Sequence, residues 1–113
     1  MMKFGINSFL LTSGFTNDDL PIIEQFKAWG ADMAEFAAFD PEQVDAAALR
    51  LAIEAAGMEN CPVCGIWPED RDLRGTEEAQ QNSLAYTGKL IDLASEIGSK
   101  IVAGPMYSCV GRC

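Results

Sequence analysis

The feature that most constrains the fold of this chain is a regular alternation of strand-like and helix-like segments. Short β-prone runs begin near residues 3, 32, 61 and 100, and each of the first three leads through a loop into an apolar pattern of helical period. Strands that are joined through helices must run parallel, and their crossovers are almost always right-handed. The alternation therefore predicts four parallel strands, over residues 3–9, 32–38, 61–66 and 100–104, with three helices between them.

Helix boundaries are marked by acceptor side chains at one end and by glycine at the other. Acceptors at residues 16–19, Asp45 and Thr76 precede the three helical patterns, and Gly30, Gly57 and Gly98 follow them. The apolar positions of each pattern fall on one face and predict the core. They are Ile22, Phe26 and Trp29 in the first helix, Leu49, Ile53 and Ala56 in the second, and Tyr86, Leu90, Leu93 and Ile97 in the third.

Two closed α/β folds fit this alternation. A doubly wound nucleotide-binding fold needs a glycine-rich turn after the first strand, and residues 7–14 contain neither that motif nor a phosphate-binding lysine. A TIM barrel fits the regular period, but it needs eight strands and about 250 residues. The 113 residues are therefore interpreted as one partial domain, the amino-terminal half of a TIM (β/α)8 barrel with strands one to four.

The charge balance restricts the classes of partner. Seventeen acidic residues against 8 basic ones give a net charge of −9, which argues against nucleic acid because phosphate binding depends on Lys and Arg. No apolar run approaches the roughly 20 residues that cross a bilayer, and the first residues do not resemble a secretory signal. We therefore expect a cytoplasmic protein that binds neither nucleic acid nor membrane.

The residues suited to metal binding are few. The chain has no histidine, and its four cysteines are Cys61, Cys64, Cys109 and Cys113. Cys61 and Cys64 form a C-x-x-C pair, but a separation of three residues places them on opposite faces of a strand. The gap to Cys109 is also longer than in ordinary zinc ribbons. These observations favour free thiols over a zinc or redox site, in keeping with a reducing compartment.

Four segments resemble the amino-terminal half of the D-tagatose/D-psicose (D-allulose) 3-epimerases, which belong to the xylose-isomerase-like TIM-barrel superfamily. They are Lys3-Phe4-Gly5-Ile6-Asn7-Ser8, Trp29-Gly30-Ala31-Asp32-Met33-Ala34-Glu35, Asp70-Arg71-Asp72-Leu73, and Gly104-Pro105-Met106-Tyr107-Ser108 with the preceding residues 99–103. Each motif is modest, and their order along almost the whole chain carries the resemblance.

The resemblance implies epimerisation of a free ketose at C3 through an enediolate. A divalent metal, Mn²⁺ or a similar ion, would stabilise the developing negative charge, and two glutamates would move the proton. In the family the metal ligands are Glu, Asp, His and Glu on the later strands of the barrel. We therefore expect no catalytic residue and no bound metal in this chain alone, and both in a complete protein.

The resemblance also implies positions in the sugar pocket. Asn7 stands at the end of the first strand, where relatives often have an aromatic residue, while Cys64 and Met106 match positions that line the pocket. Val110 lies near a position where relatives have a tryptophan that stacks on the sugar. The departures at Asn7 and Val110 leave the identity of the ketose open.

Four further residues have both a functional and a structural interpretation. Glu35 lies late in the second strand, where polar side chains of a TIM barrel face the active-site mouth, and it is a candidate substrate contact. Trp67 is a second candidate, as a wall of the pocket or as a packing residue. Arg71 and Asp72 either shape the rim or form a local ion pair.

The sequence leaves two main functions open. One is the amino-terminal portion of a ketose 3-epimerase that is inactive alone. The other is a non-catalytic half-barrel that self-associates through the open edges of its first and last strands, or docks onto a separate second half. A small sugar or sugar-phosphate binder is a third possibility, without a phosphate-binding motif to support it. Whether Cys113 is the natural end is also left open.

Overall fold

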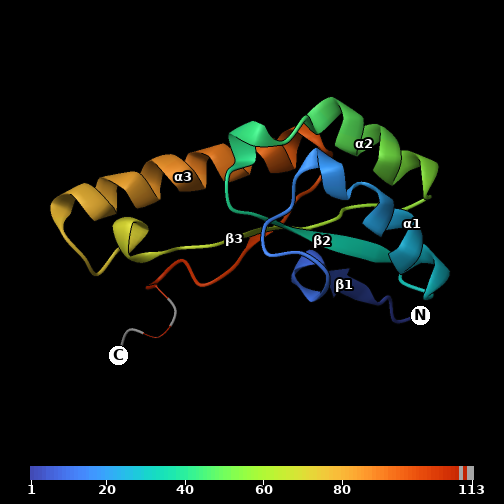
Figure 1. Cartoon of the computed structure of the whole chain (residues 1–113), viewed down its shortest axis with the longest axis horizontal. Helices are drawn as coiled ribbons and strands as arrows, with labels where there is room; N and C mark the ends of the chain where they lie inside the picture. Colours follow the sequence, from blue (N-terminus) through green and yellow to red (C-terminus); the bar gives the residue numbers. More distant parts are fainter. Residues whose placement is uncertain (110, 112–113) are drawn as a thin grey trace.

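The computed structural model describes residues 1–109 and 111 and confirms the α/β alternation (Figure 1). The strands are β1 (Gly5–Asn7), β2 (Met33–Ala38), β3 (Val63–Gly65) and β4 (Val102–Ala103), and the α-helices are α1 (Pro21–Ala28), α2 (Ala46–Ala55) and α3 (Glu77–Glu96). Four short 3-10 helices are inserted in the connections, namely η1 (Ser8–Leu10), η2 (Asn17–Asp19), η3 (Pro41–Gln43) and η4 (Glu69–Arg71).

The strands form one parallel sheet in the order β1-β2-β3-β4, so that β1 and β4 are its edges. Asn7 is in register with Glu35, Ala37 with Cys64, and Cys64 with Ala103. The same strand order and the three helices are those of part of a TIM barrel. The predicted fold class is therefore confirmed.

The core lies between the helices and one face of the sheet. The three α-helices lie along the same side of the strands in Figure 1. Phe36 of β2 and Val63 of β3 project into this layer, where they are fully buried. Leu49 of α2 and Leu90 of α3 meet them from the helices. Side chains alternate along a strand, so the other face of the sheet carries the residues in between.

The observed strands are shorter than the β-prone runs. The run over residues 3–9 yields only Gly5–Asn7, because the Asn7 side chain accepts a hydrogen bond from the Phe9 amide and caps η1 instead of continuing the strand. The run over residues 100–104 yields only Val102–Ala103. Gly104 then takes a backbone φ of 125°, which an extended strand does not tolerate.

The predicted core face of the first helix is partly wrong. Trp29 is 52 % exposed, because α1 ends at Ala28 and Trp29 is its C-terminal cap. Ile23 is buried together with Phe26, while Ile22 is only partly buried against the core. The acceptors at residues 16–19 serve η2, so α1 itself begins at Pro21.

The other two helices follow the prediction. The Asp45 side chain accepts from the Ala48 amide and opens α2, and Thr76 accepts from the Ala79 amide and opens α3. Tyr86, Leu90, Leu93 and Ile97 are all buried. Within the described residues, none of the helices combines the length and the apolar character that a membrane span requires.

Candidate functional site

Two of the predicted site residues meet on the sheet face that the helices leave uncovered. Asn7 and Glu35 are register partners on β1 and β2, and the Asn7 Nδ2 donates to Glu35 Oε1 across 2.5 Å. The Asn7 Oδ1 accepts from the Phe9 amide at 2.8 Å, which fixes the orientation of the side-chain amide. Asn7 thus holds the Glu35 carboxylate in one place on the face that a complete barrel would enclose.

Cys64 joins this pair from β3. Ala37 is its register partner and lies two residues beyond Glu35, so Cys64 and Glu35 share a face of the sheet. Burial raises the pKa of the Cys64 thiol, and the negative charge of Glu35 raises it further, while a hydrogen bond from Asn7 opposes the shift. Burial and the neighbouring carboxylate therefore disfavour the thiolate form of Cys64, which makes it a poor nucleophile.

Cys61 lies apart from this group. It belongs to the core under the helices, where burial raises the pKa of its thiol. The two members of the C-x-x-C pair therefore have different surroundings, as a separation of three residues predicts. Cys109 is half-buried, and Cys113 lies outside the described residues.

A mostly apolar pocket of about 540 Å³ opens beside Cys64 at the carboxyl end of β3. Active sites of parallel α/β barrels lie at this end of the strands. The pocket is lined by Phe9, Cys64, Gly65, Ile66, Trp67, Pro68, Glu69, Pro105 and Cys109. Segments that follow β1, β3 and β4 therefore contribute to one cavity.

Trp67 is both a core residue and a pocket wall. It is 2 % exposed and packs edge-on against the ring of Tyr86, with the ring centroids 5.3 Å apart. Its Nε1 is buried without a hydrogen-bond partner among the described residues. Since buried indole N–H groups are usually paired, this donor is free for an acceptor from outside the described chain.

Two glycines that the sequence did not single out as site residues make room for Trp67. A Cβ on Gly65 would overlap the Trp67 ring, and a Cβ on Gly104 would lie 2.8 Å from both the Gly65 carbonyl oxygen and the Trp67 ring. The only signal in the sequence was the Gly104-Pro105 pair of the family motif. The need for glycine at Gly65 and Gly104 depends on how closely β3 and β4 approach each other around Trp67, and a local sequence pattern does not reveal that distance.

The remaining predicted residues are placed as follows. Met106 is partly buried against the core, and its neighbour Pro105 lines the pocket. Val110 lies outside the described residues.

Arg71 and Asp72 contact different groups. Arg71 donates to the Phe39 carbonyl oxygen at 3.0 Å. The buried Asp72 accepts from Ser108 Oγ and from the Arg74 amide. The alternative of a local Arg71–Asp72 ion pair is therefore not the arrangement observed.

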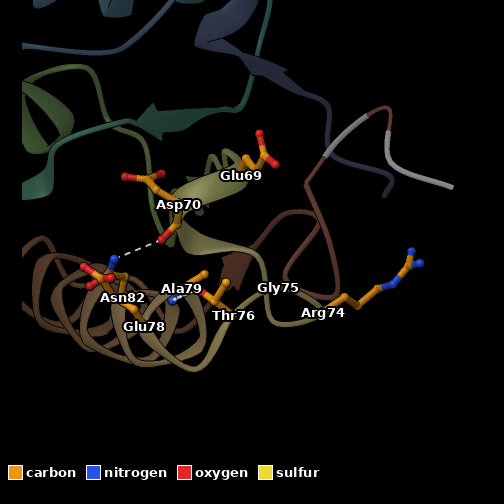
Figure 2. A pocket seen from close by; sticks show the side chains of 8 residues that line it. All are labelled: Glu69, Asp70, Arg74, Gly75, Thr76, Glu78, Ala79 and Asn82. Atoms are coloured by element: carbon orange, nitrogen blue, oxygen red, sulfur yellow. Dashed lines mark hydrogen bonds between the residues drawn. The ribbon is translucent and has the colours of Figure 1, made fainter.

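A larger cavity of about 760 Å³ lies away from the strands, at the start of α3 (Figure 2). Its side chains serve the local structure: Thr76 caps α3, and Asn82 Nδ2 donates to the Asp70 carbonyl oxygen at 3.0 Å. Arg74 extends away from the other labelled side chains in Figure 2. No lining residue lies on a strand, and we assign no site here.

The described residues do not fit a metal ion. No group of three or more Cys, Asp, Glu or His side chains in this part of the chain converges on one point. The Glu35 carboxylate already accepts a hydrogen bond from Asn7. We therefore assign no metal site to these residues.

The comparisons with known proteins agree with the motifs. No family model matches the chain. A probable ketose 3-epimerase from Synechocystis sp. is 27 % identical over 111 residues, which cover 97 % of this chain and 38 % of that protein. A curated match of this kind confirms the resemblance to the ketose 3-epimerases.

Solved structures show the same fold. A D-allulose 3-epimerase from Methylomonas sp. superposes with a TM-score of 0.86 at 18 % identity, over 99 % of this chain and 40 % of that one. An L-ribulose 3-epimerase superposes with a TM-score of 0.83 at 24 % identity, over 96 % and 37 %. The chain thus spans about two fifths of the length of these proteins, consistent with the amino-terminal half of a barrel.

Proposed function

We propose that this chain supplies the amino-terminal half of a metal-dependent ketose 3-epimerase, with the activity belonging to the complete barrel. The observation that supports this most directly is the curated match, which covers 97 % of the chain and 38 % of a probable ketose 3-epimerase. The metal ligands and the two acid/base glutamates would come from the remaining strands, because the described residues here do not fit a metal.

In this proposal the chain forms part of the sugar pocket. Asn7, Glu35 and Cys64 present polar atoms on the enclosed face of the sheet, and Trp67 closes the neighbouring apolar cavity. The unpaired Trp67 Nε1 would donate to a ketose hydroxyl, and Met106, next to the pocket residue Pro105 in the chain, would contact the sugar as the family motif implies. Substrate contacts by these five residues, a cytoplasmic location and self-association are parts of the proposal.

The nucleotide sequence downstream of the Cys113 codon tests the proposal. A reading frame that continues through strands bearing Glu, Asp, His and Glu would provide the missing ligands. A stop codon directly after Cys113 would rule out catalysis by this chain on its own. A turnover assay of the purified 113-residue chain with Mn²⁺ and D-fructose, D-tagatose or D-psicose adds a second test, in which we expect no epimerisation.

The alternative is a non-catalytic half-barrel that requires a partner. The open edges of β1 and β4 favour it, because both present backbone groups that could pair with another chain. An immediate stop codon together with a multimeric or partner-bound state in cell extracts would support this alternative over the epimerase.

A further inference from the structure

The sheet face opposite the helices is polar at one end and nearly apolar at the other. On every strand one residue packs in or against the core, and these residues are Ile6, Phe36, Val63 and Val102. Because side chains alternate along a strand, the residues beside them point to the opposite face, namely Asn7, Glu35, Cys64 and Ala103. Strong hydrogen-bonding groups on these four residues are therefore confined to Asn7 on β1 and Glu35 on β2.

The Asn7 side-chain amide has one strong and one weak acceptor. Its Oδ1 is fixed by the Phe9 amide, and its Nδ2 donates to Glu35 Oε1. Asn7 also donates to the Cys64 thiol, whose sulfur is only a weak acceptor. A hydroxyl oxygen is a better acceptor than sulfur, so it can replace Cys64 as a partner of Asn7.

The Glu35 carboxylate has acceptor capacity that its neighbours do not fill. An ionised carboxylate offers about four lone-pair positions and no donor. Asn7 takes one of them, and the Cys64 thiol also donates to Glu35. Because Glu35 is half-buried and faces away from the core, a hydroxyl group can reach the remaining positions. Hydrogen bonds from hydroxyl groups to carboxylates are among the strong ones in proteins.

The donor and the acceptor stand side by side. Asn7 Nδ2 and Glu35 Oε1 lie 2.5 Å apart, and the orientation of the amide is fixed. Two hydroxyls on neighbouring carbons match this arrangement, because one can donate its proton to Glu35 while the other accepts from Asn7. A single hydroxyl uses only half of the pair. The C–H groups of the same molecule would then lie over Cys64 and Ala103, toward the mostly apolar pocket.

We propose that Asn7 and Glu35 form a binding site for a vicinal diol, that is, for two adjacent hydroxyls of an uncharged sugar. This inference rests on the proposed function, and it assigns which part of the ketose faces β1 and β2. It makes Asn7 and Glu35 specificity-determining residues: a ketose that lacks either of the two hydroxyls would bind more weakly.

Nuclear magnetic resonance of the full, nitrogen-15-labelled chain tests the site through its side-chain amides. The probes are D-fructose, cis-1,2-cyclohexanediol and trans-1,3-cyclohexanediol, of which the last has the same composition as the second but no adjacent hydroxyls. We expect D-fructose and the 1,2-diol to shift the Asn7 side-chain signals, and the 1,3-diol to leave them in place. Asn82 is the internal control, because its side-chain amide donates to the Asp70 carbonyl oxygen away from the strands.

Glu35→Gln keeps the shape of the site and removes its charge. We expect it to weaken binding of the 1,2-diol roughly five- to tenfold, because a neutral amide oxygen is a weaker acceptor than a carboxylate. Asp32→Asn is the matched control: it removes the same charge at an exposed carboxylate that accepts from the Phe4 amide. Cys64→Ala should bind the 1,2-diol at least as tightly, because Asn7 then has no sulfur partner to give up. Circular dichroism establishes that each variant is folded.

Three results would overturn the diol site. They are Asn7 signals that stay in place until those of Asn82 begin to move, equal shifts with the two cyclohexanediols, and equal affinities of wild type and Glu35→Gln. This outcome is separate from the fate of the proposed function. A stop codon directly after Cys113 would rule out catalysis by this chain and leave the diol site standing, whereas unmoved Asn7 signals would remove the site whatever the reading frame.

Discussion

The Arg71 guanidinium lies 4.1 Å from the centre of the Tyr86 ring and joins the loop after β3 to helix α3. The same group lies 4.8 Å from the centre of the Phe39 ring and donates to the Phe39 carbonyl, so it also reaches the loop after β2. One side chain therefore connects segments that follow two neighbouring strands, at the edge of the sheet where the candidate site lies.

Replacing Arg71 should loosen this connection. We expect Arg71→Ala to lower the free energy of unfolding by about 1 kcal/mol, from the lost cation–π contacts and the hydrogen bond. Arg71→Lys should recover only part of it, because an ammonium lacks the planar stacking surface. Urea unfolding measures both, with Arg74→Ala as the control because Arg74 is exposed. Equal losses at the two arginines would contradict this role.

Removing the Tyr86 hydroxyl should lower the free energy of unfolding more than Arg71→Ala does. It donates to the Ala38 carbonyl oxygen and accepts from the Ile66 amide at 2.9 Å, and Tyr86 is buried. Tyr86→Phe leaves both backbone groups without this partner, which costs about 1–3 kcal/mol for a buried site. Urea unfolding should show this loss, whereas Tyr107→Phe should have little effect because Tyr107 is exposed.

Tyr86 should also make stability fall at high pH. Burial raises the pKa of Tyr86 above its ordinary value of 10.0, so the folded chain keeps this proton where the unfolded chain releases it. The stability that the protonated Tyr86 hydroxyl contributes is complete below pH 10, and it is lost as the pH rises through the higher pKa of the folded chain. Unfolding free energies of wild type and Tyr86→Phe should therefore converge above pH 10, and parallel curves would argue against the shift.

Glu35 should control the reactivity of Cys64. Burial and then the Glu35 charge raise the pKa of the Cys64 thiol, so its alkylation by iodoacetamide should be slow at pH 8. Glu35→Gln removes the charge and should shift the pH–rate curve of Cys64 to lower pH. Peptide mass spectrometry follows Cys64 and the half-buried Cys109 together. A rate that rises equally at every pH would indicate greater access to the thiol instead of a changed pKa.

The glycines beneath Trp67 should resist substitution. Gly65→Ala would force its methyl group into the Trp67 ring and to 2.6 Å from Leu90 Cδ1, and overpacking of this kind costs about 1–3 kcal/mol. Gly104→Ala adds the strain of a backbone φ of 125°. Near-ultraviolet circular dichroism would detect the disturbed indole, and urea unfolding the lost stability. Gly88→Ala, where space is open, should show neither effect.

The order of elements could be read from the sequence, because the alternation and the capping residues are local signals. Asp45 and Thr76 open their helices as expected, and the parallel order follows from the connections. Trp29 was misplaced because its spacing from Phe26 fits a helix that continues through Trp29, whereas α1 ends one residue earlier, at Ala28. Burial there depends on where α1 stops, which the apolar period alone does not set.

The candidate site was only partly accessible to sequence reasoning. The contact between Asn7 and Glu35 depends on the register between β1 and β2, and the fit of Gly65 and Gly104 around Trp67 depends on the distance between β3 and β4. Asn7 and Glu35 lie 28 positions apart, and Gly104 is still farther along the chain from Gly65 and Trp67. Single-chain patterns carry no information about such distances.

The shortness of the two edge strands has a consequence for how the molecule opens. β4 has two residues and β1 has three, whereas β2 has six and lies between two neighbours. Local fluctuations that release an edge strand break few bonds, while release of β2 requires both neighbours to separate. Amide hydrogen exchange should therefore proceed from the rim inward: the Phe36 amide, bonded to the Pro62 carbonyl, should outlast the Val63 amide, whose partner is Ile101 beside β4.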